Sequence, residues 1–171
     1  NGLLDDWMIA RKGQAADWDG KVAASGRVDE AVLANYMGHD YFHLPPPKSL
    51  DRHDFNLDAA SHLSEEDGAA TLTAFTARAI AEGRRFFPAP AARWLVCGGG
   101  RHNPTLMAEL QRALNAPVMP VEAVGWRGDA MEAEAFAFLA VASSRGLPLS
   151  FPGTTGVASP MTGGRVNQPT D

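Results

Sequence analysis

Three consecutive glycines, Gly98 to Gly100, constrain this chain more than any other part of its sequence. They follow a short apolar run, Trp94 to Val96, and lead at once into Asn103-Pro104, a pair typical of a helix start. Glycine has no Cβ, so three in a row allow a sharp turn and let a ligand lie directly against the main chain. A strand that ends in such a loop and leads into a helix is a common nucleotide site in α/β proteins. The sequence therefore predicts an α/β fold with a nucleotide on this turn.

Length and composition fit a single globular domain. The chain has 171 residues, of which 45% are hydrophobic and 20% are charged, enough for a substantial core. The net charge of −5 argues against a nucleic-acid partner, and no apolar run approaches the roughly 20 residues that span a bilayer. Cys97 is the single cysteine, so no internal disulfide is expected, and we expect its thiol to be buried. These properties predict a cytoplasmic protein that binds neither nucleic acid nor membranes.

Helix patterns outnumber strand patterns along the chain. Apolar spacing and cap residues predict helices from an Asn1 cap to about Arg11, from Val28 to Met37, from a Ser64 cap to about Arg85, from an Asn103 cap to about Leu114, and from Asp129 to Ser144. A buried strand is predicted over 93–97 and an edge strand over 118–121, with loops over 13–26 and 41–49, the latter a polyproline segment. Two strands do not make a stable sheet, so we expect the sheet to be incomplete in this chain. The 129–144 helix is apolar almost all round, so we expect it to be covered on several sides.

The glycine turn has two other interpretations. One is a tight strand-to-helix turn without a ligand, although a single glycine would suffice for that. The other is a dinucleotide fingerprint, because Gly98 and Gly100 have the right spacing and Glu122 lies where a ribose-binding acid would stand. Asn103 occupies the position of the third glycine, which allows close packing of helix and strand. A Rossmann-like nucleotide-binding or oxidoreductase domain therefore stays an alternative.

Two further groups of residues are candidates for binding. Glu132 follows Asp129 by three residues, so the pair either forms a capping box or places a carboxylate at the mouth of the helix to bind sugar hydroxyls. Lys48 and Arg52 flank the proline run and either hold a carboxylate or phosphate or belong to a solvated loop. The histidines lack the spacing of metal ligands, so no metal site is expected.

Several long motifs occur in an order that is typical of one family. They are Asp19-Gly20-x-x-Ala23-Ala24-Ser25-Gly26-x-Val28, Pro45-Pro46-Pro47-Lys48-Ser49, Phe55-Asn56, Val96-Cys97-Gly98-Gly99-Gly100-Arg101-His102-Asn103-Pro104-x-Leu106-Met107, Gly128-Asp129-Ala130-Met131-Glu132-Ala133-x-Ala135-Phe136-Ala137 and Thr155-Gly156-Val157-Ala158-Ser159-Pro160. In these motifs, which cover essentially the whole chain, the sequence resembles the anhydro-N-acetylmuramic acid kinases of cell-wall recycling. It departs from them at Leu50-Asp51-Arg52-His53, where the family usually has Thr-Gly-Arg-Glu, so only the arginine remains.

The resemblance implies a fold and a domain assignment. The family belongs to the sugar kinase, heat-shock-70 and actin superfamily, whose two ribonuclease-H-like lobes hold ATP between them. Residues 1–171 look like the C-terminal, ATP-binding lobe of such a kinase, helix-rich and with part of the sheet missing. Asn1 looks like the last residue of an Asp-x-Gly-Pro-Gly-Asn motif whose aspartate is the family's general base. That base would lie just upstream of Asn1, so no catalytic residue is expected in this chain.

The resemblance also implies an activity. Such enzymes direct a water onto the anomeric carbon of 1,6-anhydro-N-acetylmuramic acid and phosphorylate the freed O6 from ATP, with Mg²⁺, to give N-acetylmuramic acid 6-phosphate. Gly98, Gly99, Gly100 and Asn103 would flank the adenosine, and Glu132 would face the sugar pocket. Relatives that pair suggest a homodimer. The chain alone is expected to be inactive, and a non-catalytic interaction module is the alternative from a different functional class.

Overall fold

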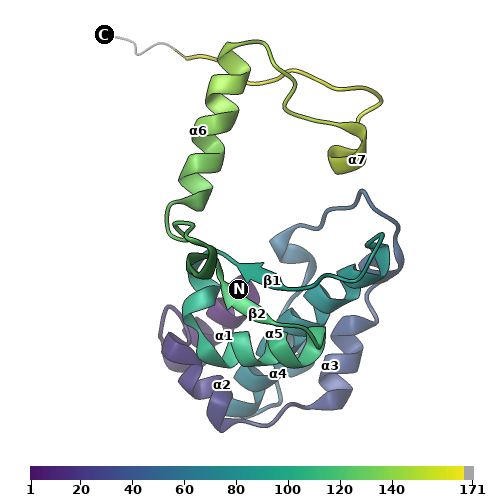
Figure 1. Cartoon of the computed structure of the whole chain (residues 1–171). Helices are drawn as coiled ribbons and strands as arrows, with labels where there is room; N and C mark the ends of the chain where they lie inside the picture. Colours follow the sequence, from purple (N-terminus) through teal and green to yellow (C-terminus); the bar gives the residue numbers. More distant parts are fainter. Residues whose placement is uncertain (168–171) are drawn as a thin grey trace.

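Helices make up most of the structure, and they pack beside a two-stranded parallel sheet (Figure 1). The computed structural model describes residues 1–167, the side chain of Arg52 excepted. The helices are α1 (Gly2–Lys12), α2 (Lys21–Ser25), α3 (Glu30–Met37), α4 (Glu65–Glu82), α5 (Pro104–Leu114), α6 (Met131–Ser144) and α7 (Pro152–Thr155), and the strands are β1 (Trp94–Val96) and β2 (Val118–Pro120). Among these residues, no helix is both long enough and apolar enough to cross a lipid bilayer. The predicted helix-rich α/β class is confirmed.

Helix α4 is the element around which the others assemble, because α1, α2, α3 and α5 all contact it. It begins after Ser64, whose hydroxyl accepts a hydrogen bond from the Asp67 amide at 3.1 Å, as predicted for an N-cap. Acidic residues fill its first turn, where the helix dipole favours them. Leu72 and Phe75 of this helix are buried, whereas Ile80 is 42% exposed.

The larger core lies between α1, α2, α3 and α4. Trp7 on α1 is only 1% exposed, and its indole nitrogen donates a hydrogen bond to the Glu65 carbonyl at 2.9 Å. This bond joins the middle of α1 to the first residue of α4. On the side of α3, the core is closed by aromatic side chains whose rings contact one another: Tyr36, Phe42, Phe55 and Phe75.

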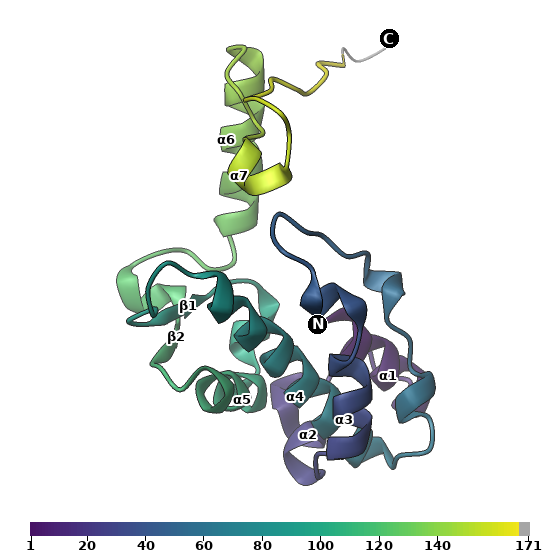
Figure 2. The ribbon, with the colours of Figure 1, turned by 90° about the vertical axis from the view of Figure 1, so that its right-hand side faces the viewer.

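A second core lies between α4, α5 and the sheet. Leucines at a helical spacing on α5 pack with alanines of α4 and with the strands: Leu106, Leu110, Leu114, Ala77, Ala81, Trp94, Val96 and Val118. The two strands pair in parallel, with Trp94 opposite Val118, so α5 is the crossover between them. Figures 1 and 2 show β1 and β2 lying beside α5. This topology brings the carboxyl end of β1 to the start of α5, where the chain passes through the glycines.

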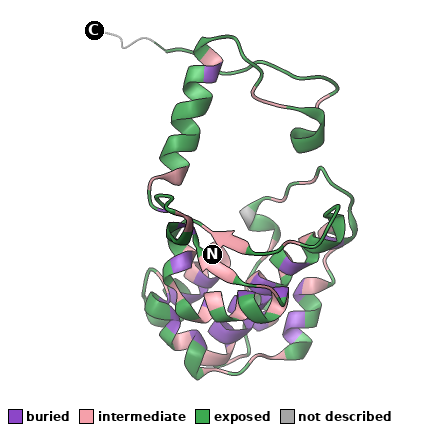
Figure 3. Ribbon diagram, in the orientation of Figure 1, coloured by how far each residue is buried: buried purple, intermediate pink, exposed green. Residues whose placement is uncertain are grey.

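Helix α6 extends away from the body of the molecule, as Figures 1 and 2 show. Almost its whole length is exposed (Figure 3), and Phe136 and Phe138 are 66% and 71% exposed. The prediction that this helix is covered on several sides is therefore wrong for the described residues. The sequence pattern identified an apolar helix correctly, but the described residues supply almost nothing that packs against it.

The segment 13–26, predicted to be a loop, contains a 3₁₀ turn over Trp18–Gly20 and helix α2. The buried carboxylate of Asp17 stabilises the first turn of α2, because its two oxygens accept hydrogen bonds from the amides of Val22 and Ala23, both at 2.9 Å. Helix α2 is shorter than two turns, so its apolar spacing could not be distinguished from that of a loop.

Asn1 and Cys97 also differ from their predicted roles. Asn1 precedes α1, but its side chain makes no capping hydrogen bond; its Oδ1 instead accepts one from the Thr76 hydroxyl at 2.9 Å. Cys97 is exposed rather than buried, because β1 ends at Val96 and is itself only partly buried. The hydrogen bond of Asn1 and the exposure of Cys97 both depend on residues distant in sequence, which local patterns do not reveal.

Replacing Trp7 with alanine tests the larger core. The change removes a buried ring and its bond to Glu65, so we expect the free energy of unfolding to fall by about 3–5 kcal/mol. Ile9→Ala on the same helix is the matched control, because Ile9 is 57% exposed and its loss should change stability by no more than about 0.5 kcal/mol. Urea unfolding followed by circular dichroism measures both. Equal losses would contradict this assignment of the core.

Candidate functional site

The glycine turn has the strand–turn–helix geometry that the sequence predicts. After β1, Gly98 adopts a positive φ of 74°, and a 3₁₀ turn over Gly99–His102 follows. Asn103 then caps α5, because its Oδ1 accepts a hydrogen bond from the Leu106 amide at 2.9 Å. A Cβ added to Gly98 or Gly99 would meet no heavy atom within 4 Å. The main chain of the turn is therefore bare and open on this side.

A cleft of about 270 Å³ lies beside the turn. Gly99, Gly100 and Asn103 form one wall, Asp5 of α1 lines another part, and Trp18 of the Trp18–Gly20 turn contributes a third. The cleft thus gathers three segments that are far apart in sequence. Gly98 lies just before the part of the turn that lines it, and the other predicted nucleotide residues lie on it.

The turn over Trp18–Gly20 is fixed firmly against the start of α5. The Thr105 hydroxyl donates a hydrogen bond to the Gly20 carbonyl at 2.8 Å, across 85 positions of sequence. A Cβ on Gly20 would lie 2.2 Å from Asn103 Oδ1, and Gly20 has a φ of +67°, so only glycine fits here. This close approach explains why a glycine stands at that point of the motif and sets the width of the cleft.

The Arg101 guanidinium joins the glycine turn to two other segments. Its side chain is only 2% exposed. Nε donates to Glu122 Oε1 at 2.9 Å, Nη1 donates to the Gly98 carbonyl at 2.9 Å, and Nη2 lies 2.7 Å from Asp129 Oδ1. A Cβ on Gly128 would stand 2.4 Å from Arg101 Nε, so any larger residue at position 128 would displace the arginine side chain.

The sequence alone does not predict a role for Arg101. The available signal was a cation directly after the glycines, with acids at 122 and 129, but nothing local shows that these residues meet. The pairing also bears on two of the alternatives that the sequence leaves open. Asp129 does not cap α6, whose N-cap position is held by Ala130 without a side-chain bond, so the predicted capping box with Glu132 does not form. Glu122, the acid of the dinucleotide alternative, is bound by Arg101.

Arg101 also shifts the acid–base equilibria of its partners. Its hydrogen bond holds the pKa of Glu122 below the usual 4.5. Hydrogen bonds from Arg101 and then from His102 hold the pKa of Asp129 below the usual 3.8. The hydrogen bonds to these carboxylates also raise the pKa of Arg101, and the bond to Glu122 has the larger effect. The three groups therefore all stay charged at neutral pH.

The remaining predicted residues lie outside the cleft. Glu132 is exposed in the first turn of α6, and its neighbour Glu134 pairs with Arg127. Lys48 is engaged by its own loop: Nζ donates to the Tyr41 carbonyl at 2.7 Å and lies 4.3 Å from the centre of the Tyr41 ring. This favours the loop interpretation of Lys48 over an anion site. In the part of the chain that is described, no three His, Cys, Asp or Glu side chains gather as a metal site would require.

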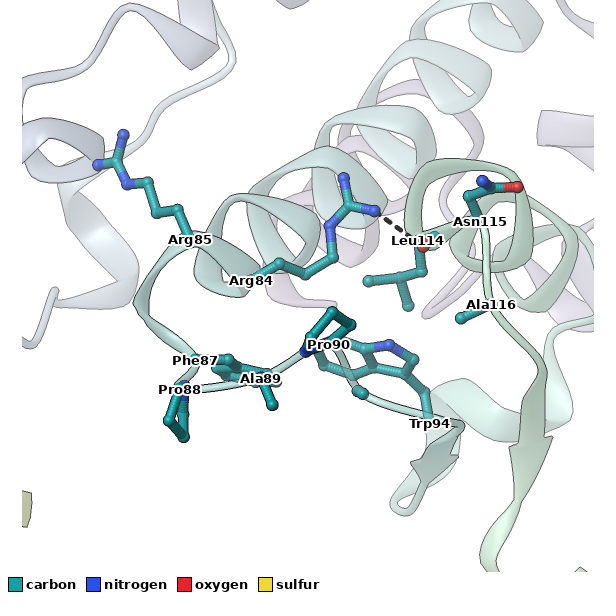
Figure 4. A pocket seen from close by; sticks show the side chains of 11 residues that line it. Arg84, Arg85, Phe87, Pro88, Ala89, Pro90, Trp94, Leu114, Asn115 and Ala116 are labelled. Carbon is teal, nitrogen blue, oxygen red and sulfur yellow. Dashed lines mark hydrogen bonds between the residues drawn. The ribbon is translucent and has the colours of Figure 1, made fainter.

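A second hollow, of about 530 Å³, lies at the other end of β1 (Figure 4). Trp94 stacks with Phe87 there, with ring centroids 5.4 Å apart, and Arg84 donates a hydrogen bond to the Leu114 carbonyl at 2.8 Å, drawn as a dashed line. Prolines, which have no N–H group, form much of its rim. Although this hollow is larger, it offers no bare turn of main chain, so the glycine cleft is the better candidate for a nucleotide.

Comparison with known proteins identifies the family. A sequence profile for anhydro-N-acetylmuramic acid kinase matches residues 1–168. The chain belongs to the anhydro-N-acetylmuramic acid kinase family. Proteins of that name from Rhodospirillum rubrum, Rhizorhabdus wittichii and Paramagnetospirillum magneticum are 59%, 55% and 54% identical to it over 96%, 99% and 99% of its length. The same alignments cover 44%, 46% and 48% of those proteins, so the chain spans about half the length of the relatives it matches.

Membership of the anhydro-N-acetylmuramic acid kinase family confirms the resemblance seen in the motifs. It favours the kinase over the oxidoreductase alternative, in agreement with the engagement of Glu122 by Arg101. The motif residues Gly20 and Asn103 bring two of the cleft segments together. The family's shared motifs therefore coincide with the construction of the cleft.

Acid should weaken the Arg101 cluster. Because the pKa values of Glu122 and Asp129 are lowered in the folded protein, their pairing contributes stability above their usual values of 4.5 and 3.8. That stability is lost as the pH falls through the lowered values. The gap in unfolding free energy between the wild type and Arg101→Met should therefore narrow from about pH 4 downward. Urea unfolding at a series of pH values measures it.

Arg112→Met is the matched control for this experiment. Arg112 pairs with Glu109 at 2.6 Å, but its side chain is 68% exposed, so its loss should change stability little at any pH. A gap between wild type and Arg101→Met that does not vary with pH would contradict the assigned ion pairs.

Proposed function

We propose that the protein to which this chain belongs is an ATP-dependent anhydro-N-acetylmuramic acid kinase, and that residues 1–171 supply its C-terminal, ATP-binding lobe of ribonuclease-H type. The family assignment and the names of the relatives support the activity. The open glycine turn is the main support for assigning ATP binding to this chain, because its bare main chain can accept a nucleoside. The parallel β1–α5–β2 unit agrees with such a lobe.

The proposed reaction couples hydrolysis to phosphoryl transfer. A water attacks the anomeric carbon of 1,6-anhydro-N-acetylmuramic acid and gives its proton to a general base, and the bond from that carbon to O6 breaks. O6 attacks the γ-phosphorus of ATP, ADP leaves, and N-acetylmuramic acid 6-phosphate forms. We assign no general base within this chain. Phosphoryl transfer depends on positioning and charge neutralisation, and the proposed contribution of this chain is to position the nucleotide.

Gly98, Gly99, Gly100 and Asn103 are proposed to hold the adenosine. The cleft volume of about 270 Å³ is near the lower end of the range of about 300–1,000 Å³ for ligand pockets, so it suits the nucleoside portion. Mg²⁺ commonly binds through one or two carboxylates together with phosphate oxygens. Asp5, a carboxylate on the cleft wall, fits that pattern and would hold the ion, which neutralises phosphate charge.

Glu132 is proposed to face the sugar. Arg101 binds both the Gly98 carbonyl and Asp129, which stands three residues before Glu132. The nucleotide turn and the start of α6 are therefore tied together, as a reaction between a sugar oxygen and a nucleotide phosphate requires. We also propose, from the family assignment alone, that the protein forms a homodimer and is cytoplasmic.

Gly99→Val tests the nucleotide turn. The free protein has room for the new side chain, since a Cβ at Gly99 meets nothing within 4 Å, so folding should be unaffected. The valine would stand where the nucleoside is proposed to lie, and we expect ATP to bind at least about tenfold more weakly, a cost of about 1.4 kcal/mol. Gly83→Val is the matched control, because Gly83 is equally open and lies outside the cleft. Calorimetric titration with ATP and with NADH measures binding; NADH binding without ATP binding would support the oxidoreductase alternative instead.

Glu132→Gln tests the sugar contact. Loss of a charged hydrogen-bond partner typically costs about 1.5–3 kcal/mol, so kcat/KM for the anhydro-sugar should fall about 10- to 100-fold in the full-length protein. The dissociation constant for ATP should stay unchanged. Glu134→Gln, two positions along the same helix, is the control and should retain activity. A coupled assay of ADP release gives the rates, and unchanged kcat/KM in Glu132→Gln would remove this residue from the sugar site.

A further inference from the structure

Trp18 lies on the wall of the glycine cleft, yet its side chain is 68% exposed. A tryptophan that stabilises the fold is buried, as Trp7 is at 1% exposure. Trp18 therefore contributes little to the core, and the indole leaves a large apolar face in contact with water beside the proposed nucleotide turn. Such a ring at the edge of a cleft is suited to stacking against a planar ligand.

The backbone that carries Trp18 is held in place before any ligand arrives. On one side, Asp17 is 5% exposed and accepts two amide hydrogen bonds from the start of α2. On the other side, Gly20 is in tight contact with Asn103 and receives the hydrogen bond of Thr105. The exposed Trp18 ring thus stands on a fixed backbone, so it can contact a ligand at a small entropic cost.

The glycine turn lines another part of the same cleft. Gly99 and Gly100 present peptide groups without side chains, and Asn103 stands beside them. A flat heterocycle that rests on these peptides would lie in the same cleft as the exposed Trp18 ring. Stacking of a base on an aromatic side chain is worth a substantial part of nucleotide affinity, and every base offers a π-face for it.

We propose that Trp18 stacks on the base of the nucleotide held by the glycine turn and supplies much of the affinity for the nucleoside portion. This inference rests on the proposed nucleotide site and adds to it a residue that lies 80 positions before Gly98. Within the one ligand, Trp18 would hold the base, and other groups, among them Asp5 through Mg²⁺, would hold the phosphates.

Two ligands separate these contributions in the full-length protein. Wild type, Trp18→Ala and Trp18→Phe are titrated calorimetrically with ATP and with inorganic tripolyphosphate. We expect Trp18→Ala to weaken ATP binding roughly 5- to 100-fold, Trp18→Phe to restore most of the affinity, and tripolyphosphate to bind all three proteins equally. Trp126→Ala is the matched control, since Trp126 is 54% exposed and is not part of the cleft. Because Trp18 is exposed, all variants should have wild-type melting temperatures.

Tryptophan fluorescence gives a second readout. Stacking should quench part of the emission when ATP is added but not when tripolyphosphate is added, and Trp18→Phe should bind ATP with most of that quenching lost. Equal ATP affinity in wild type and Trp18→Ala would overturn the role of Trp18 and leave the nucleotide site standing. Absence of ATP binding by the wild type would overturn the proposed site and this inference with it.

Discussion

The contacts of Arg101 hold together the three segments on which the proposed function depends. The guanidinium reaches the glycine turn through Gly98, the end of the β-sheet region through Glu122 and the start of α6 through Asp129. A planar group with several fixed donors can satisfy two carboxylates and a carbonyl at once, which an ammonium group cannot do with the same geometry. The guanidinium itself is buried, whereas the side chains of Glu122 and Asp129 are 46% and 82% exposed, so solvent and salt reach the carboxylate side of both pairs. The glycine turn is thus open on one face and firmly supported on the other.

The cleft is built by a second long-range constraint. Gly20 approaches Asn103 so closely that no side chain fits, and the Thr105 hydroxyl fastens the same point. The family motif around Gly20 and the motif around the glycine turn are distant in sequence but form adjacent walls of one cleft. A shared physical task, keeping two backbones at a fixed separation, accounts for the small residues that both motifs contain.

The sequence predicts those parts of the structure whose causes are local. Ser64 and Asn103 cap α4 and α5 as expected, because a cap acts within one helical turn. The glycine turn was identified for the same reason, since its conformational freedom is a property of its own residues. The Arg101 cluster, the exposure of Cys97 and the exposure of α6 were not predicted, because each depends on which distant segments are present to pack or pair. Helix α2 was missed because the carboxylate of Asp17 starts it from outside the helix.

Helix α6 shows why an ionic contact rather than packing governs the proposed site. Its apolar side chains are mostly exposed, Phe136 and Phe138 among them, so they do not fix where the helix begins. The short segment before it is held instead by the ion pair between Asp129 and Arg101 and by the close approach of Gly128 to the Arg101 side chain. Reaction rates are sensitive to displacements of about 1 Å between reacting groups. The arginine ties the glycine turn to Asp129, three positions before Glu132, and so supplies a fixed point for the start of an otherwise exposed helix.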